Sequence, residues 1–390
     1  MRPLVARICE ELLRIAWAGA LDNESVQSVT FAQTFQQLCR WPIVLKRLSG
    51  GLVAITGASK ATLKDVADRV GVSVSAVSMA LADHPRIGES TKRRVMLAAD
   101  ELGYVSNAAA RALQAKRAGA VALIVPNTSS HVLGHSYFMH VLTGVNEVAL
   151  SRSVQLVLST NVDELNGQAV YDRVLRSGLV DGAIVTSAAA ADPGIEQLAN
   201  SGLPVVMLGR YPHLPDAVSV WTDDIAGSRA ATEHLIQAHG RRKLVHISGP
   251  LDHRSAMDRR DGFTAACAAS GVESRVIEGD YGEDSGSSAV DQLGDEPIDG
   301  IVAANDEMAF GALRALQARG VGVPDDVALI GYDDFGLSRV TTPAISTVHV
   351  PAGDMARVAA EQLFLLLEGK EPVPSSTVPL RLELRQSCGC

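Results

Sequence analysis

The sequence predicts a small three-helix domain followed by a larger two-lobed α/β body with parallel sheets. Apolar residues recur at helical spacing in a basic stretch between residues 61 and 102. From Ala120 onward, short apolar strands alternate with helical segments. The chain has 390 residues, of which 47% are hydrophobic and 20% charged, so it is long enough for two or three domains with sizeable cores.

Residues 61–82, ATLKDVADRVGVSVSAVSMALA, predict two short helices joined by a tight turn. The first helix has one apolar face, formed by Leu63, Val66, Ala67 and Val70. Gly71 can end it at a positive φ, Val72 turns inward, and Ser73 can cap the second helix. The inward side of that helix is Val77, Ala80 and Leu81, and its outer side carries small or flexible groups, namely Val74, Ser75, Ser78 and Met79. This pattern predicts a helix-turn-helix whose second helix reads the DNA major groove.

A third helix is predicted over residues 91–102, with Lys92, Arg93 and Arg94 at its start. From Ser59 to Ala120, ten Lys and Arg residues face six Asp and Glu residues, a balance of +4 in a chain whose net charge is −9. We expect this basic charge to meet DNA phosphates, while the acidic remainder discourages nonspecific adhesion.

Three runs, TLKDVADRVGVSVSAVSMAL, HPRIGESTKRRV and ADELGYVSNAAARAL, resemble the amino-terminal domain of LacI/GalR-type transcription regulators. The resemblance extends from Ser59 to about Gly389. It implies that Val74 and Ser75 read bases, that Ser78 contacts a phosphate, and that Leu113 wedges into the minor groove. The full set of predicted DNA contacts is Val74, Ser75, Ala76, Ser78, Met79, Asn107, Ala110 and Leu113.

Met79 departs from the family pattern, because many members carry a guanine-reading arginine at this position. A methionine cannot make a bidentate hydrogen bond to a base edge, so specificity there must come from apolar contact or DNA shape. The segment SNAAARALQ, residues 106–114, is a helix too short to be stable alone. We expect it to fold when it pairs with its twin on a bent operator.

Residues 1–58 do not fit the family pattern. Glu10, Glu11 and Arg14 interrupt any apolar segment that a signal peptide would need. The stretch is either a short amphipathic helix pair or not a natural part of the protein. Within it, VAITGAS looks like the start of a dinucleotide-binding motif, but Ala61 and Leu63 stand where that motif needs glycines. We therefore divide the chain into the extension 1–58, the DNA-binding domain 59–105, the hinge helix and linker 106–117, and the body 118–390.

The body contains consecutive apolar runs typical of strands covered on both faces: VALIVP, VQLVLST, GAIVTS, PVVMLG, KLVHIS, GIVAA and VALIGY. They form two groups, separated near residues 212–220, which indicates two lobes with a cleft between them. The resemblance implies a periplasmic-binding-protein-like effector domain. Its first lobe would comprise about 118–218 and 346–368, and its second about 219–345 and 369–390.

Polar side chains that follow strands are the candidate effector contacts, because ligands bind at the carboxyl ends of parallel strands. These are Arg259, Tyr281, Asn305 and Asp333, which the family also implies, and their guanidinium, carboxamide and carboxylate groups suit paired hydroxyls. Asn305 or Asp306 could instead cap a helix, and Arg259 could pair with Asp258 or Asp261. In the first lobe, His131, His135 and Tyr137 are weaker candidates.

Several other functions are excluded by the sequence. It contains no Walker loop, HExxH or GxSxG motif, so we expect no enzyme and no cofactor. No apolar run is long enough to cross a membrane. The five cysteines have scattered spacing, which favours a reducing cytoplasm. Cys388-Gly389-Cys390 could bind metal, but we expect a frayed tail there and no metal site.

The sequence therefore predicts a sequence-specific transcription regulator, most simply a repressor. It would bind a palindromic operator as a homodimer, with a tetramer as the alternative, under the control of a small-molecule effector. A sugar is the expected effector, with a purine or nucleoside as the alternative. The rival prediction is a solute-binding receptor with the same two lobes, which would require a secretion signal and no helix-turn-helix.

Overall fold

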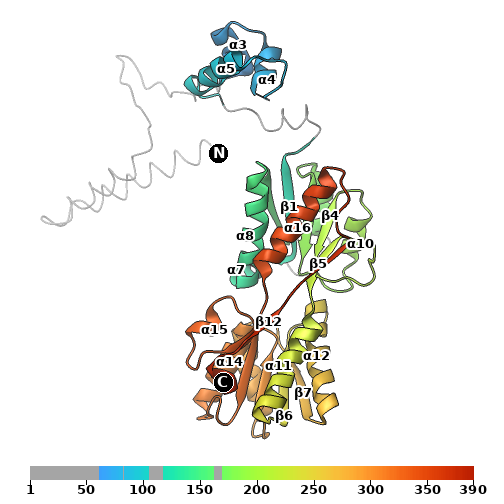
Figure 1. The fold of residues 1–390 in the computed structure, drawn as a ribbon, viewed down its shortest axis with the longest axis vertical. Coiled ribbons are helices and arrows are strands. Elements are labelled where there is room, and N and C mark those ends of the chain that lie inside the picture. Colours follow the sequence, from blue (N-terminus) through green and yellow to red (C-terminus); the bar gives the residue numbers. More distant parts are fainter. Residues whose placement is uncertain (1–60, 82, 105–116, 162–168) are drawn as a thin grey trace, which may run out of the picture. The chain divides into compact units, whose positions relative to one another are not determined.

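A computed structural model describes residues 61–81, 83–104, 117–161 and 169–390 (Figure 1). The chain divides into two compact units, residues 1–105 and 106–390. The predicted extension over residues 1–58 lies outside the described residues, as do the hinge residues Asn107, Ala110 and Leu113.

The first unit contains the three predicted helices, α3 (Leu63–Val70), α4 (Val74–Leu81) and α5 (Glu89–Glu101). Helix α3 begins with a capping box between Thr62 and Asp65 and ends at Gly71, where φ is 75°. Ser73 caps α4 as predicted, since its hydroxyl accepts a hydrogen bond from the Ala76 N–H at 3.1 Å. The core comprises the buried residues Val66, Ala67, Val70, Val77, Ala80, Val95, Ala98 and Ala99.

The three basic residues near the start of α5 differ in their contacts. Lys92 lies one turn before the buried Val95, and its ammonium group pairs with Asp83 at 2.5 Å and Glu89 at 3.0 Å. Arg94 donates to the Val70 carbonyl at 2.6 Å, at the carboxyl end of α3. Arg93 and Arg94 are both exposed residues, whereas Lys92 is buried.

The first lobe of the second unit is a six-stranded parallel sheet in the order β11-β5-β4-β3-β1-β2. Its strands are β1 (Ala120–Thr128), β2 (Gln155–Asn161), β3 (Gly182–Thr186), β4 (Val205–Leu208), β5 (Ser219–Thr222) and β11 (Ser375–Val378). Its helices are α7 (Ser129–Gly134), α8 (Ser136–Ser151), α9 (Ala169–Ser177), α10 (Pro193–Ala199) and α16 (Ala352–Leu367).

The second lobe is a six-stranded sheet in the order β12-β10-β9-β8-β6-β7. Its strands are β6 (Lys243–Ser248), β7 (Glu273–Glu278), β8 (Gly300–Ala303), β9 (Ala328–Asp333), β10 (Ser346–His349) and β12 (Arg381–Glu383). All pairs are parallel except that of β12 with β10. Its helices are α11 (Asp224–His239), α12 (Arg254–Ser270), α13 (Glu283–Leu293), α14 (Asp306–Ala318), α15 (Leu337–Val340) and the 3₁₀ turn η2 (Gln386–Cys388).

The strand pairing corrects the predicted lobe boundaries at three points. Strand β5 pairs with β4 in the first lobe, although residues 219–345 were assigned to the second. Strand β10 pairs with β9 in the second lobe, so only α16 of residues 346–368 belongs to the first. Strand β11 pairs with β5 in the first lobe, although residues 369–390 were assigned to the second. Strand β5 contains too many polar residues to form an apolar run, and the other two boundaries were implied by the family resemblance and not by the apolar runs.

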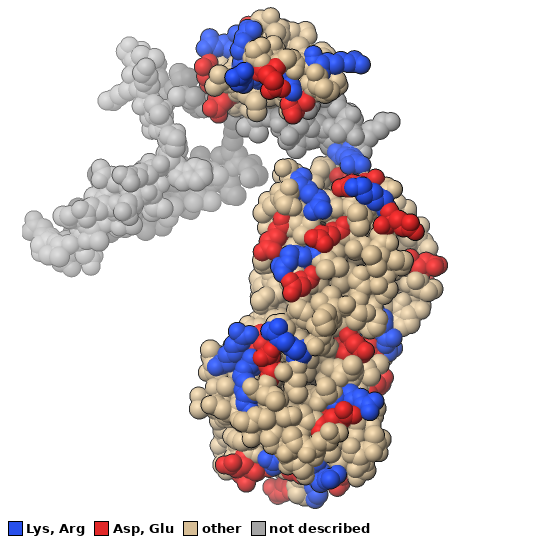
Figure 2. Space-filling model, viewed as in Figure 1, with Lys and Arg blue, Asp and Glu red and all other residues tan. Residues whose placement is uncertain are grey.

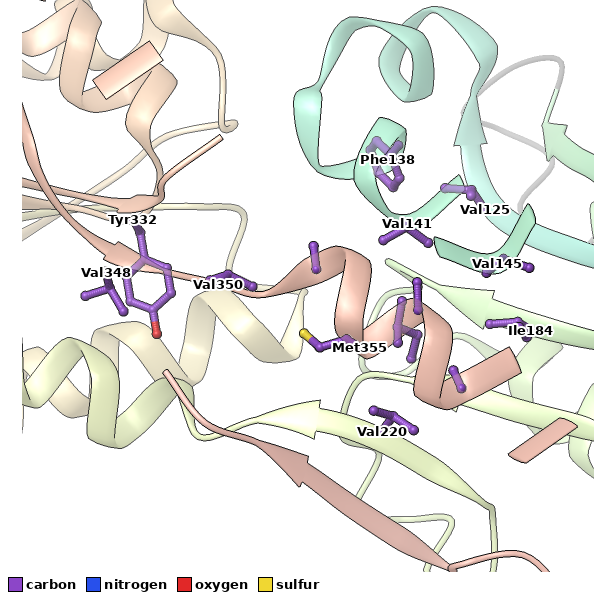
Figure 3. Packing of buried hydrophobic residues seen from close by; sticks show 14 of the residues in the cluster. Val125, Phe138, Val141, Val145, Ile184, Val220, Tyr332, Val348, Val350 and Met355 are labelled. Carbon is purple, nitrogen blue, oxygen red and sulfur yellow. The ribbon is translucent and has the colours of Figure 1, made fainter. Parts of the chain in front are cut away.

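Helix α16 packs onto α8 so closely that a Cβ atom on Gly144 would lie 2.3 Å from the Gly353 carbonyl oxygen. One hydrophobic cluster runs from this helix pair into the second lobe. Figure 3 shows Val350 and Met355 of the crossover between Tyr332 and Val348 on one side and Val141 and Val145 on the other. The apolar core is therefore continuous through the β10–α16 connection. Among the described helices, none has the length and hydrophobicity that a membrane span requires.

Candidate functional site

The predicted base-reading residues lie on the outer face of α4. Val74 is 44% exposed and Ser75 is also exposed, while Ala76, Ser78 and Met79 are half-buried. Val77 and Ala80, on the opposite face, are buried in the core of the domain and fix the orientation of the helix. Figure 2 shows Lys and Arg side chains interspersed with Asp and Glu on this unit. A short helix thus presents small side chains outward from a firm base, as a groove-reading helix must.

A cavity of about 140 Å³ lies between the two lobes, at the carboxyl ends of their strands. All four predicted effector contacts line it: Arg259, Tyr281, Asn305 and Asp333. His135 and Tyr137 line it from the first lobe, whereas the side chain of His131 is not described. Asp306 does not line the cavity. Its carboxylate is buried and accepts hydrogen bonds from the Thr347 hydroxyl and the Asp334 N–H.

Arg259 is held at the cavity wall by groups other than those expected. Its Nε donates to Asp224 at 2.9 Å and one Nη donates to the Ala304 carbonyl at 2.5 Å. Its guanidinium carbon lies 3.8 Å from the centre of the Tyr332 ring. The alternative partners are engaged elsewhere, because Asp258 pairs with Arg210 and Arg254 and Asp261 pairs with Arg260. The guanidinium is therefore fixed in direction before any ligand arrives.

Asp333 ends β9 with a φ of 107°, which is rare for a residue other than glycine. Its carboxylate lies 3.5 Å from Arg259 Nη1. Burial raises the pKa of this carboxyl well above its ordinary value, and the Arg259 charge opposes that only in part. Tyr281 and Ser187, which also line the cavity, have positive φ values of 69° and 54°. Such backbone strain concentrates where a ligand is held.

Asn305 caps α14, since its Oδ1 accepts a hydrogen bond from the Met308 N–H at 2.9 Å. Its Nδ2 donates to the Tyr281 carbonyl at 2.8 Å and to Glu307 at 2.9 Å. Asn305 therefore acts as a helix cap, one of the two alternatives we considered, and it also positions two neighbours in the wall. The Tyr281 ring rests on Gly249, where a Cβ atom would lie 2.1 Å from Cζ of the ring. This close packing limits the movement of the Tyr281 ring, which lines the cavity.

The sequence reasoning missed several residues of the wall. Arg210, which follows β4 of the first lobe, donates to both carboxylate oxygens of Asp258 on α12 of the second lobe at 3.1 Å. Asp224, at the start of α11, holds Arg259, and Trp221 adds an aromatic face. The position of Arg210 directly after the run PVVMLG was a usable signal, because it places this residue at a strand end. No such signal pointed to Asp224, because strand β5, which precedes it, was not recognised in the sequence.

The lobes also contact each other beside the cavity. The His140 ring stacks on Phe335 of the second lobe, with ring centroids 4.6 Å apart. The Ala190 N–H donates to the Asp252 carbonyl at 2.7 Å. Arginines 210, 254 and 259 face the carboxylates of Asp224, Asp258, Glu307 and Asp333 in the wall. This near-balance of charges, together with aromatic faces, is suited to a neutral ligand with several hydroxyls.

Comparison with known proteins finds family models and relatives that agree with one another. Residues 62–107 match the family described as bacterial regulatory proteins, lacI family, and residues 232–388 match a periplasmic binding protein-like domain. The chain is 33% identical over 330 residues to the HTH-type transcriptional regulator CelR of Thermobifida fusca, which covers 83% of this chain and 95% of that protein.

Two solved structures share the fold over most of this chain. A complex of the transcriptional regulator CelR with cellobiose has a TM-score of 0.65 at 30% identity, and covers 84% of this chain and 100% of that one. The lac repressor dimer bound to operator and the anti-inducer ONPF has a TM-score of 0.76 at 24% identity, and covers 85% of this chain and 99% of that one. The second likeness concerns the fold alone.

Proposed function

The chain belongs to the LacI family of bacterial regulatory proteins, and we propose that it is a cytoplasmic repressor controlled by a sugar. The family makes it a regulator of transcription and not an enzyme. The observation that carries the proposal is that one chain combines an outward-facing helix α4 with a polar, aromatic cavity between two lobes. A solute-binding receptor would need the cavity alone.

The proposed DNA contact is made by α4 in the major groove, through Val74, Ser75, Ala76, Ser78 and Met79. Two copies of the chain related by two-fold symmetry would read a roughly palindromic operator, with the hinge residues Asn107, Ala110 and Leu113 at its centre. Arg93 and Arg94 are exposed on the first unit, whereas the Lys92 ammonium group pairs with Asp83 and Glu89, so we expect a moderate attraction to DNA phosphates.

Selection of genomic fragments with the purified full-length chain at moderate salt tests this proposal. A palindrome should be enriched, and Ser75→Glu should abolish its binding because a carboxylate would face bases and phosphates. The variant should fold normally, since Ser75 is exposed and an acidic residue suits the first turn of a helix. Ser288→Glu, on an exposed position of α13, is the matched control. If no palindrome is enriched, or if both variants bind equally, the DNA proposal is wrong.

The proposed effector is a neutral sugar or sugar derivative. Arg259 and Asp333 would bind its hydroxyls, Tyr281 and Trp221 would cover its ring, and Asn305 would hold Tyr281 in place. A thermal-shift screen of mono- and disaccharides against nucleosides tests this class. Stabilisation by nucleosides alone would make the effector a purine or nucleoside.

Coupling to DNA would follow from the relative angle of the lobes. The cavity wall is shared between them, so a ligand that binds one arrangement better than the other shifts the equilibrium between arrangements. A coupling of about 1–3 kcal/mol changes operator affinity about 5- to 150-fold. Fluorescence anisotropy of a labelled operator, with and without ligand, measures both the size of the change and its sign.

A further inference from the structure

Four metal-ligating side chains gather at the carboxyl end of α11, in the second lobe. They are His234 and His239 of that helix and Cys388 and Cys390 of the final segment, and their ligand atoms all lie within 4.8 Å of one another. The two Nε2 atoms are 3.1 Å apart, and Cys390 Sγ lies 3.4 Å from each of them. Both cysteines are free thiols.

We propose that these four residues form a binding site for a zinc ion. Zinc takes four nitrogen and sulfur ligands in a tetrahedron, with Zn–N distances of about 2.0–2.1 Å and Zn–S distances of about 2.3 Å. Such a tetrahedron has edges of about 3.3 Å between nitrogens and about 3.6 Å between nitrogen and sulfur. The three distances above lie within a few tenths of an ångström of these edges. Two imidazoles and two thiols are soft ligands that disfavour magnesium and calcium.

The segment that carries the cysteines is firmly held, so the expectation of a frayed tail is wrong. The Ser387 hydroxyl donates to the Leu329 carbonyl at 2.6 Å and accepts from the Ser346 N–H at 2.8 Å. Cys388 is fully buried. The described structure thus presents the two thiols to the helix from a fixed turn, which lowers the entropic cost of closing a metal site.

Gly389, between the two cysteines, packs against the same cluster. Its φ is 103°, and a Cβ atom there would lie 3.1 Å from Nδ1 of His239. A side chain at this position would strain the turn and press on the imidazole. Gly389→Ala therefore perturbs the proposed site while leaving all four ligands present.

His239 and Cys388, the two ligands from different segments that lie nearest in sequence, are 149 residues apart. A bound ion would therefore link helix α11 to the final segment of the chain. Helix α11 begins at Asp224, the carboxylate that holds Arg259 in the cavity wall, and ends at His239. The ion would thus fix the far end of the helix that supports the effector cavity, and its role is to stabilise the second lobe.

The test uses the full-length chain, reduced, with Cys9→Ser and Cys39→Ser so that its other thiols are Cys267, Cys388 and Cys390. The chain is equilibrated with Zn²⁺ against a competing chelator, and bound metal is measured by elemental analysis. Co²⁺ replaces Zn²⁺ for absorption spectroscopy. We expect one ion per chain, the visible absorption of tetrahedral thiolate-bound Co²⁺, and a higher melting temperature with Zn²⁺.

His234→Ala and Cys390→Ser should each weaken binding at least tenfold and remove the Co²⁺ absorption, and Gly389→Ala should weaken it to a smaller degree. Far-UV circular dichroism checks that each variant is folded. The matched controls are Cys267→Ser, a buried thiol outside the cluster, and His213→Ala, an exposed histidine. The proposal is overturned if the ligand variants bind Zn²⁺ as the controls do, or if the chain does not retain Zn²⁺ against the chelator.

Discussion

Asp333→Asn separates the proposed ligand contact from the folding role of this residue. The substitution removes the negative charge and keeps the side-chain shape. Asparagine also tolerates positive φ better than alanine, and φ is 107° here. Asp333 is only 8% exposed; burial disfavours its charged form and the Arg259 charge favours it, so exchange for a neutral amide removes two opposing effects together. We expect the free energy of unfolding to change by less than about 1 kcal/mol.

The expected loss is in ligand affinity. One carboxylate oxygen faces Arg259 at 3.5 Å, which leaves the other to accept a hydroxyl hydrogen bond. A hydrogen bond to a charged group contributes about 1.5–3 kcal/mol, so its weakening corresponds to a loss of roughly 10- to 150-fold at most. Operator affinity without ligand should stay within about threefold, because Asp333 lies in the lobe that does not connect directly to the DNA-binding unit.

Calorimetry with the ligand found by the screen measures the first effect, and operator anisotropy measures the second. Asp284→Asn, an exposed residue of α13, is the matched control for the loss of one negative charge. Ligand affinity within twofold of the original would refute the assignment of Asp333 to the effector site. Loss of operator binding without ligand would show that the residue is structural.

Three further predictions concern other parts of the molecule. Arg210→Ala should weaken ligand binding about fivefold in calorimetry by loosening the contact between lobes, since the pair with Asp258 contributes about 1 kcal/mol; unchanged affinity would contradict this. Burial lowers the pKa of His246 to about 4, so between about pH 4 and 6.5 the unfolded chain binds a proton that the folded chain does not. The free energy of unfolding therefore decreases as pH falls from about 6.5 toward 4. As pH falls from 7 to 5, the free energy of unfolding of His246→Phe, measured in urea, should therefore rise relative to that of the original chain. An equal pH dependence of the two chains would contradict this prediction. Deletion of residues 2–58 should leave operator affinity and melting temperature nearly unchanged, because the predicted core does not use them; a loss above about 1 kcal/mol in folding stability would show that they pack.

The sequence determined the parts of this protein that depend on local patterns. The helix-turn-helix followed from apolar spacing, Gly71 and Ser73, since its helices form and pack within about forty residues of chain. The strands covered on both faces were recognisable as apolar runs. Arg259, Tyr281, Asn305 and Asp333 were found because they follow strands or belong to the family pattern, and the structure brings all four to one cavity.

Only the tertiary structure decided which distant segments meet. Strands β5, β10 and β11 contain alternating or polar residues, and their lobe depends on the backbone of a partner strand elsewhere in the chain. The pairs Arg210–Asp258 and Asp224–Arg259 join residues 48 and 35 positions apart. Cys390 reaches His234 across 156 positions. Such contacts depend on how complete helices and strands pack against one another. The periodicity of a short stretch of sequence does not determine that packing.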